Sequence, residues 1–142
     1  MTENPALADL APIVGEWDME LSSAEFLPDP QQTVRGRVVF SWIEGGALIA
    51  MRQGSDATWV IGRDEKSDEY TILYCDSRGI SRVYQMTLEK RIWRIWRNNA
   101  EFSQRYEGHL SDDYKTITSH WEKSTDGGKT WNHDFDMTFT RG

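Results

Sequence analysis

The sequence predicts an all-β protein, a closed antiparallel up-and-down β-barrel of about ten strands with a short N-terminal capping helix. Apolar and polar residues alternate with a period of two from Trp17 to the end of the chain, as in strands with one wet face. Turn residues interrupt this alternation every ~8–12 residues, which is typical of an all-β sandwich or barrel. The connections are short, and closure removes the edges that so long a meander would leave exposed.

One segment, roughly 5–13, has helical spacing. Asn4 and Pro5 are a typical helix start, with the asparagine as N-cap and the proline in the first turn. The apolar stripe that follows consists of Ala6, Leu7, Leu10, Ala11 and Ile13. Pro12 and Gly15 limit the helix to about two turns. We expect it to cover one mouth of the barrel.

Strand-like runs follow one another to the C-terminus. The first opens at Trp17, which we expect to plug one end of the barrel, and the last, Asp134 to Arg141, closes the barrel beside it. The runs between them lie near 36–42, 47–51, 59–61, 70–75, 80–88, 91–97, 102–110 and 117–121. Polar turns join these runs, for example Asp76 to Gly79.

Length and charge exclude several classes of protein. A chain of 142 residues predicts one domain, 1–142, and a net charge of -7 disfavours nucleic acid as a partner. The longest aliphatic run, 47–51, is far shorter than the ~20 residues of a membrane-spanning helix, so we expect no membrane insertion. We see no signal peptide, and we expect a cytoplasmic protein. The oligomeric state is open, with a homodimer as one option.

Gly15-Glu16-Trp17 on the first strand, with Arg141 ending the last, resembles the calycin superfamily of lipocalins and fatty-acid-binding proteins. In lipocalins this arginine packs across the tryptophan of the G-x-W motif, and the resemblance implies the same contact here. The short helix, the 42–46 segment and the final Trp-rich hairpin look closer to a set of bacterial lipocalin-like proteins of unknown function. Nitrobindins, with ten-stranded barrels and a late haem-ligating histidine, resemble the chain more distantly. Their motif after the tryptophan is missing from 18–23.

A second motif lies near the C-terminus. Ser124 to Trp131 matches the Asp-box pattern S-x-D-x-G-x-T-W, which in sialidases and other β proteins is a hairpin element remote from catalysis. Asp126 can accept backbone N–H groups in the turn, and Gly127-Gly128 allow positive φ. We therefore expect a structural role, and the motif is not evidence for glycosidase activity.

The alternation also predicts which polar side chains face the interior. Five of them are Arg82, Tyr84, Gln104, Tyr106 and Ser119. His133 would face inward as well, together with Phe135 and the alternate residues after it. The 91–97 run is ambiguous because its period is three. Either Ile92, Arg94 and Trp96 face inward, or Trp93 and Ile95 do, and we favour the first.

An interior lined by arginine, tyrosine and aromatic rings suits a ligand with an anionic head and an apolar body. Fatty-acid-binding proteins use an arginine and a tyrosine in this way, and the resemblance implies that role for Arg82, Arg94 and Tyr106. The predicted ligand-binding residues are Trp42, Met51, Arg82, Tyr84, Arg94, Trp96, Tyr106 and His133. Alternatively, Arg82 or Arg94 pairs with a core carboxylate or lies at a barrel mouth.

The predicted function is non-enzymatic binding or transport of a small hydrophobic ligand, which could be anionic, in the barrel interior. One alternative is a haem-binding barrel of nitrobindin type with His133 as ligand. Another is an isomerase-like enzyme that uses the same cavity, since some calycin barrels are isomerases. A barrel packed solid by its own side chains is the third. We predict no catalytic residue, no metal site and, apart from the haem alternative, no cofactor.

Overall fold

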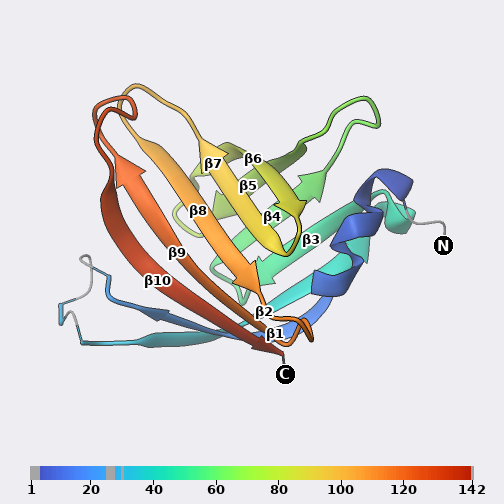
Figure 1. The fold of residues 1–142 in the computed structure, drawn as a ribbon, viewed down its shortest axis with the longest axis horizontal. Coiled ribbons are helices and arrows are strands. Elements are labelled where there is room, and N and C mark those ends of the chain that lie inside the picture. Colours follow the sequence, from blue (N-terminus) through green and yellow to red (C-terminus); the bar gives the residue numbers. More distant parts are fainter. Residues whose placement is uncertain (1–3, 25–27, 30, 142) are drawn as a thin grey trace.

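The computed structural model describes residues 4–24, 28–29 and 31–141. Ten strands form one closed sheet, with two short 3-10 helices beside it (Figure 1). In chain order the elements are η1 (Pro5–Ile13), β1 (Gly15–Ser22), β2 (Val34–Ile43), η2 (Glu44–Gly46), β3 (Leu48–Gln53), β4 (Ala57–Gly62), β5 (Tyr70–Asp76), β6 (Ser81–Glu89), β7 (Ile92–Arg97), β8 (Ser103–Leu110), β9 (Thr116–Ser124) and β10 (Asn132–Arg141). No helix within the described ranges is long and apolar enough to cross a membrane.

The barrel closes between its first and last strands. Each strand pairs antiparallel with its neighbours in the chain, and β1 also pairs with β10, where Trp17 lies opposite Arg141 and Met19 opposite Phe139. Closure thus pairs the two strands that would otherwise be the edges of the sheet. The predicted up-and-down barrel of about ten strands is confirmed.

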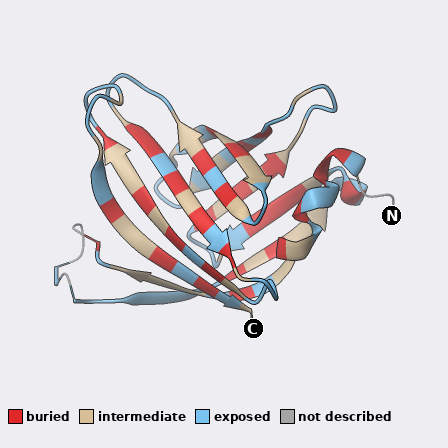
Figure 2. Ribbon diagram, in the orientation of Figure 1, coloured by how far each residue is buried: buried red, intermediate tan, exposed pale blue. Residues whose placement is uncertain are grey.

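Burial alternates along most strands, as the period of two predicts (Figure 2). The inward side chains form one continuous core that is rich in aromatic rings. Its buried aromatic members are Trp17, Phe40, Trp59, Tyr70, Tyr84, Trp93, Tyr106, Trp121 and Phe139. The core therefore fills the barrel with large, rigid side chains.

Helix η1 covers one end of the barrel, which we call the closed end. The Asn4 Oδ1 atom accepts the Ala6 N–H at 3.0 Å, as the capping pattern predicts, and the Asn4 N–H donates to the Gly46 carbonyl at 2.7 Å. Leu7 and Leu10 are completely buried under the helix. Tight 3-10 geometry suits this short segment with a proline in its last turn. The predicted capping helix is confirmed.

Arg141 secures the closed end from the other terminus. Its guanidinium carbon lies 3.9 Å from the centre of the Trp17 ring, and its N–H groups donate to the Val14 carbonyl at 2.9 Å and to the Pro12 carbonyl. Gly15 has φ +132°, and a Cβ atom there would lie 2.7 Å from Arg141 Nη1. Glycine is therefore required beside this arginine, and the expected arginine–tryptophan contact is confirmed.

The predicted facing of β7 is wrong. Trp93 and Ile95 are buried, whereas Arg94 is exposed and lies 3.2 Å from a Glu107 carboxylate oxygen. The reason is the preceding turn. Only Lys90 and Arg91 join β6 to β7, and both have positive φ, as in a two-residue hairpin turn. Leu88 packs on the core and lies opposite Trp93 in the register, so the Trp93 side chain faces inward as well.

The predicted inward facing of His133 is also wrong. His133 lies opposite Glu122, but the next register pair is Phe135 with Trp121, so that Asp134 is an extra residue in β10. Such a bulge changes the face on which the preceding side chains lie. The His133 ring is exposed on the outer wall, with Nε2 2.9 Å from Asp136 Oδ1.

The Asp-box hairpin joins β9 to β10. Asp126 Oδ1 accepts the Thr130 N–H at 2.9 Å and the Ser124 hydroxyl at 2.8 Å. These donors, the Thr130 hydroxyl first among them, lower the pKa of Asp126 to about 2. Gly127 and Gly128 have positive φ. The carboxylate thus holds the turn, as the structural interpretation of the motif predicts.

Candidate functional site

The barrel interior is filled. Its cavity has a volume of about 20 Å³, which is room for one water molecule and far below the roughly 300–1,000 Å³ of a ligand pocket. The lining residues are Met51, Gln53, Trp59, Trp93, Ile95, Tyr106, Trp121, Met137 and Phe139. The interior therefore agrees with the alternative of a barrel packed solid by side chains.

Three of the predicted ligand-binding residues belong to this packed interior. Met51 and Tyr106 are buried, and Trp42 packs against the core. The Tyr106 hydroxyl has no hydrogen-bond partner among the described residues, and burial raises the pKa of Tyr106 far above its ordinary value. It lies over Gly108, where a Cβ atom would come within 2.8 Å of the hydroxyl oxygen. These side chains complete the core and border no space for a ligand.

The end of the barrel opposite η1, which we call the open end, carries the polar interior groups. Tyr84 on β6 donates its hydroxyl to Gln104 Oε1 on β8 at 2.6 Å, and both residues are buried. The Tyr84 ring lies 5.1 Å from Trp59 and 6.0 Å from Trp121, centre to centre. Edge and tilted ring contacts of this kind hold aromatic side chains in place. Tyr84 and Gln104 thus form a fixed polar floor at the open end.

Arg82 on β6 and Arg97 on β7 stand over this floor. Burial raises the pKa of Tyr84, and the guanidinium groups of Arg82 and Arg97 oppose that shift. The Arg82 guanidinium carbon is also 5.2 Å from the centre of the Phe102 ring. Within the described ranges, neither arginine has a carboxylate within ion-pair distance. Two positive charges therefore line one pocket, and no carboxylate of the described residues lies within ion-pair distance of either.

Most other arginines of the wall do have such a partner. Those paired with a carboxylate are Arg35, Arg37, Arg78, Arg91, Arg94 and Arg105. Arg94 and Arg105, for example, are neighbours of the open end on the outer wall and lie 3.2 Å and 2.8 Å from Glu107 and Glu122. Among the described residues, Arg82 and Arg97 thus differ from these six arginines in having no carboxylate within ion-pair distance.

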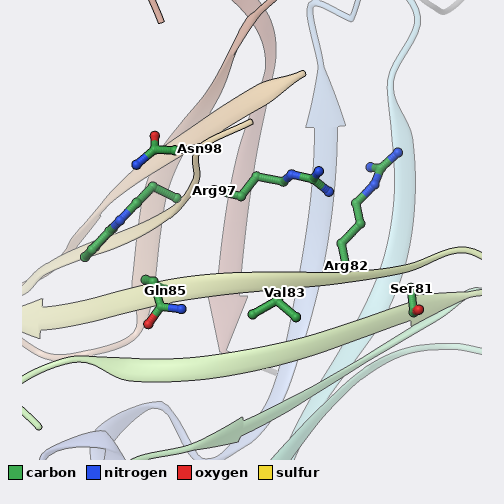
Figure 3. A pocket seen from close by; sticks show the side chains of 7 residues that line it. Ser81, Arg82, Val83, Gln85, Arg97 and Asn98 are labelled. Atoms are coloured by element: carbon green, nitrogen blue, oxygen red, sulfur yellow. The ribbon is translucent and has the colours of Figure 1, made fainter. Parts of the chain in front are cut away.

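A pocket of about 440 Å³ lies beside these two arginines, where β6 and β7 separate. The last pair of the two strands is Gln85 with Trp96, so the start of β6 has no partner on β7. Figure 3 shows the Arg97 side chain extending toward the Arg82 side chain, with Val83 below both. The residues that line the pocket are Ser81, Arg82, Val83, Gln85, Trp96, Arg97 and Asn98. They combine cationic, amide and hydroxyl donors with two apolar side chains.

The structure brings three of the predicted ligand-binding residues to this place. Arg82 and Trp96 line the pocket, and Tyr84 lies beneath its arginines. The outer wall carries Arg94 and His133 instead. Sequence reasoning did not select Arg97. Its signal was the second of the two facings considered for β7, because an inward Trp93 and Ile95 place the next alternate residue, Arg97, at the mouth.

The histidines of the described residues lie on the outer wall of the barrel. No group of three histidine, cysteine or acidic side chains in the described part of the chain could hold a metal ion. His109 and His133 each lie beside a single carboxylate on the outer wall, at 3.1 Å from Glu107 and 2.9 Å from Asp136. The residues do not fit haem held by His133 inside the barrel, because the imidazole faces outward and the interior is filled.

No protein-family model and no curated protein matches the chain. Among solved structures, the chain is similar to the crystal structure of Rv2717c from M. tuberculosis, with a TM-score of 0.65 and 12% sequence identity over 99% of each chain. At this identity the likeness concerns the fold alone. The same barrel fold thus extends over nearly the whole length of both chains.

Proposed function

We propose that the protein is a non-enzymatic binding protein of calycin type whose small ligand has an anionic head and an apolar body. The ligand lies at the open end of the barrel, in the pocket beside Arg82 and Arg97. The observation that carries the proposal is the pair of arginines that line this pocket (Figure 3) beside the Tyr84–Gln104 floor, neither of which has a carboxylate within ion-pair distance among the described residues. Arginine forks match carboxylate and phosphate oxygens in geometry as well as in charge.

The pocket also supports the apolar half of the ligand. Its volume of about 440 Å³ lies in the range of small-molecule sites. Val83, which is 55% exposed, and the half-buried Trp96 lie on the outer faces of β6 and β7 at the rim, and both line the pocket. An apolar body that covers these side chains removes their surface from water, which stabilises the complex.

The pocket lining favours binding over catalysis. It contains no histidine, cysteine or acidic side chain, so a nucleophile with an adjacent base, or an acid–base pair, is missing from it. Ser81 is its one hydroxyl side chain, and no general base accompanies that hydroxyl in the lining. The contact of Arg141 with Trp17 supports the calycin type of barrel.

Isothermal titration calorimetry with 1-naphthoate and its neutral analogue 1-naphthylmethanol tests the proposal. We expect 1-naphthoate to bind, the neutral analogue to bind at least about tenfold more weakly, and Arg82→Gln or Arg97→Gln to remove about tenfold or more of the affinity. Arg94→Gln, on the same strand as Arg97 but on the outer wall, is the matched control and should leave the affinity unchanged. Equal binding of the two compounds, or no binding, contradicts the proposal.

A further inference from the structure

The proposed function requires one anionic group on the ligand, but the open-end pocket carries two positive charges. Arg82 and Arg97 both line the pocket, with the Arg97 side chain extending toward that of Arg82 (Figure 3), and no carboxylate of the described residues lies within ion-pair distance of either. A monocarboxylate would neutralise one charge and leave the other. A phosphate monoester carries about -1.5 to -2 charges at pH 7 and would neutralise both.

The hydrogen-bond donors that line the pocket also favour a phosphate monoester over a carboxylate. A guanidinium has five N–H donors in a planar fork and no acceptor. Ser81, Gln85 and Asn98 add a hydroxyl and two amide groups to the lining, and none of the lining side chains is an anion. A phosphate monoester presents three terminal oxygens, whereas a carboxylate presents two. The larger acceptor set matches two guanidinium groups, each of which can hold two oxygens.

The surroundings restrict the ligand to a small molecule. The outer wall next to the pocket carries alternating charges, with Arg94 paired to Glu107 and Arg105 paired to Glu122. The chain as a whole has a net charge of -7. A nucleic-acid backbone needs an extended basic surface, and a pair of arginines in a pocket of about 440 Å³ is not one.

We infer that the open-end pocket takes a small phosphate monoester with an apolar, ring-sized body, its phosphate held between Arg82 and Arg97 and its body against Val83 and Trp96. This inference rests on the proposed function and names the class of its anionic head.

Calorimetry with 1-naphthyl phosphate, 1-naphthoate and inorganic phosphate tests the inference. We expect the phosphate ester to bind at least about tenfold more tightly than 1-naphthoate, since a second charge-assisted contact contributes on that scale. Inorganic phosphate alone should bind at least about tenfold more weakly than the ester, because Val83 and Trp96 then contact no ligand. In Arg82→Gln and Arg97→Gln the advantage of the ester over 1-naphthoate should disappear, whereas Arg94→Gln should keep it.

The pH dependence gives a second readout that does not require a variant. The second ionisation of a phosphate monoester has a pKa of about 6, so the ester should lose about tenfold in affinity between pH 7.5 and pH 5, while 1-naphthoate, a monoanion at both pH values, should change little. Equal affinity of the ester and 1-naphthoate at pH 7.5 overturns the inference and leaves the proposed function standing. If neither compound binds, the proposed function fails as well.

Discussion

Each end of the barrel has an arginine stacked on an aromatic ring, but the two arginines differ in their partners. At the closed end, the guanidinium of Arg141 lies over Trp17 and donates to main-chain carbonyls. At the open end, Arg82 lies over Phe102, and neither it nor Arg97 has a carboxylate partner within the described ranges. Arginine thus donates to main-chain carbonyls at the closed end, whereas at the open end it contacts an aromatic ring and, among the described residues, no carboxylate.

The largest expected effect is at the closed end. Trp17 is completely buried, and its Nε1–H donates to the Ile13 carbonyl at 2.9 Å. Trp17→Ala should lower the free energy of unfolding by about 3–5 kcal/mol in urea denaturation, because it leaves a cavity and an unpaired carbonyl. The half-buried Trp131 of the Asp-box hairpin is the control, and Trp131→Ala should cost about 1 kcal/mol or less.

Should Trp17→Ala fail to fold, Trp17→Phe keeps a ring at the closed end and removes the hydrogen bond, with an expected loss of about 1–2 kcal/mol. Similar losses in Trp17→Ala and Trp131→Ala would contradict the assignment of stability to the closed end.

The same substitution at three arginines tests the comparison most directly. Arg141→Gln should lower the free energy of unfolding by about 2–3 kcal/mol, because it removes the donors of the Val14 and Pro12 carbonyls and the stacking on Trp17. Arg82→Gln and Arg97→Gln should change it by less than about 0.5 kcal/mol, since no ion pair is lost. Urea denaturation measures the free energy of unfolding of all three variants. A loss in Arg82→Gln as large as that in Arg141→Gln would mean that the open-end arginines stabilise the fold.

Between the two ends, Gly108 tests whether the interior is filled. A Cβ atom at this position would lie 2.8 Å from the Tyr106 hydroxyl oxygen and 3.1 Å from the ring. Gly108→Ala should therefore destabilise the barrel by about 1–2 kcal/mol in urea denaturation, because it overpacks the core. Tyr106→Phe removes the closest atom, so the double variant should lose less than the sum of the single variants. Strict additivity would mean that the two residues are not in contact.

The smallest effect concerns the exposed Asp126 at the tip of the β9–β10 hairpin. Its pKa is lowered from 3.8 to about 2, so its contribution to stability is present above pH 3.8 and declines as the pH falls toward 2. The difference in urea midpoint between the wild type and Asp126→Asn should be largest near pH 6 and smaller near pH 2.5. A difference independent of pH would show that the Asp126 charge does not hold the turn.

Sequence patterning predicted the closed end better than the open end. Trp17 and Arg141 lie near opposite ends of the sequence, yet each lies in a run whose alternation is unbroken, 17–21 and 135–141. The pairing of their strands therefore followed from closure, and the contact of the two side chains was what the resemblance implied. The same alternation correctly placed Tyr84 and Tyr106 inside. Facing follows from a period of two wherever no turn or bulge intervenes.

The wrong predictions of side-chain facing concern segments where a turn or a bulge shifts the inward–outward alternation. The two-residue turn at Lys90-Arg91 sets the phase of β7, but this pair lacks the Asn-Gly or Asp-Gly signal of such turns. The extra residue Asp134 turns His133 outward, and nothing in the local sequence marks that bulge. The pocket depends on where β6 and β7 separate, and the filled interior depends on the summed volumes of side chains from all strands. Neither is a property of one segment.

The filled interior has a consequence for kinetics. In a hollow barrel a ligand must pass between strands or beneath a lid, and that opening limits how fast it enters and leaves. Here the cavity of about 20 Å³ excludes such a route, and the proposed ligand would contact only the rim between β6 and β7. Its exchange would then need no separation of paired strands, so its residence time would be set by the contacts of the two arginines and would shorten with added salt.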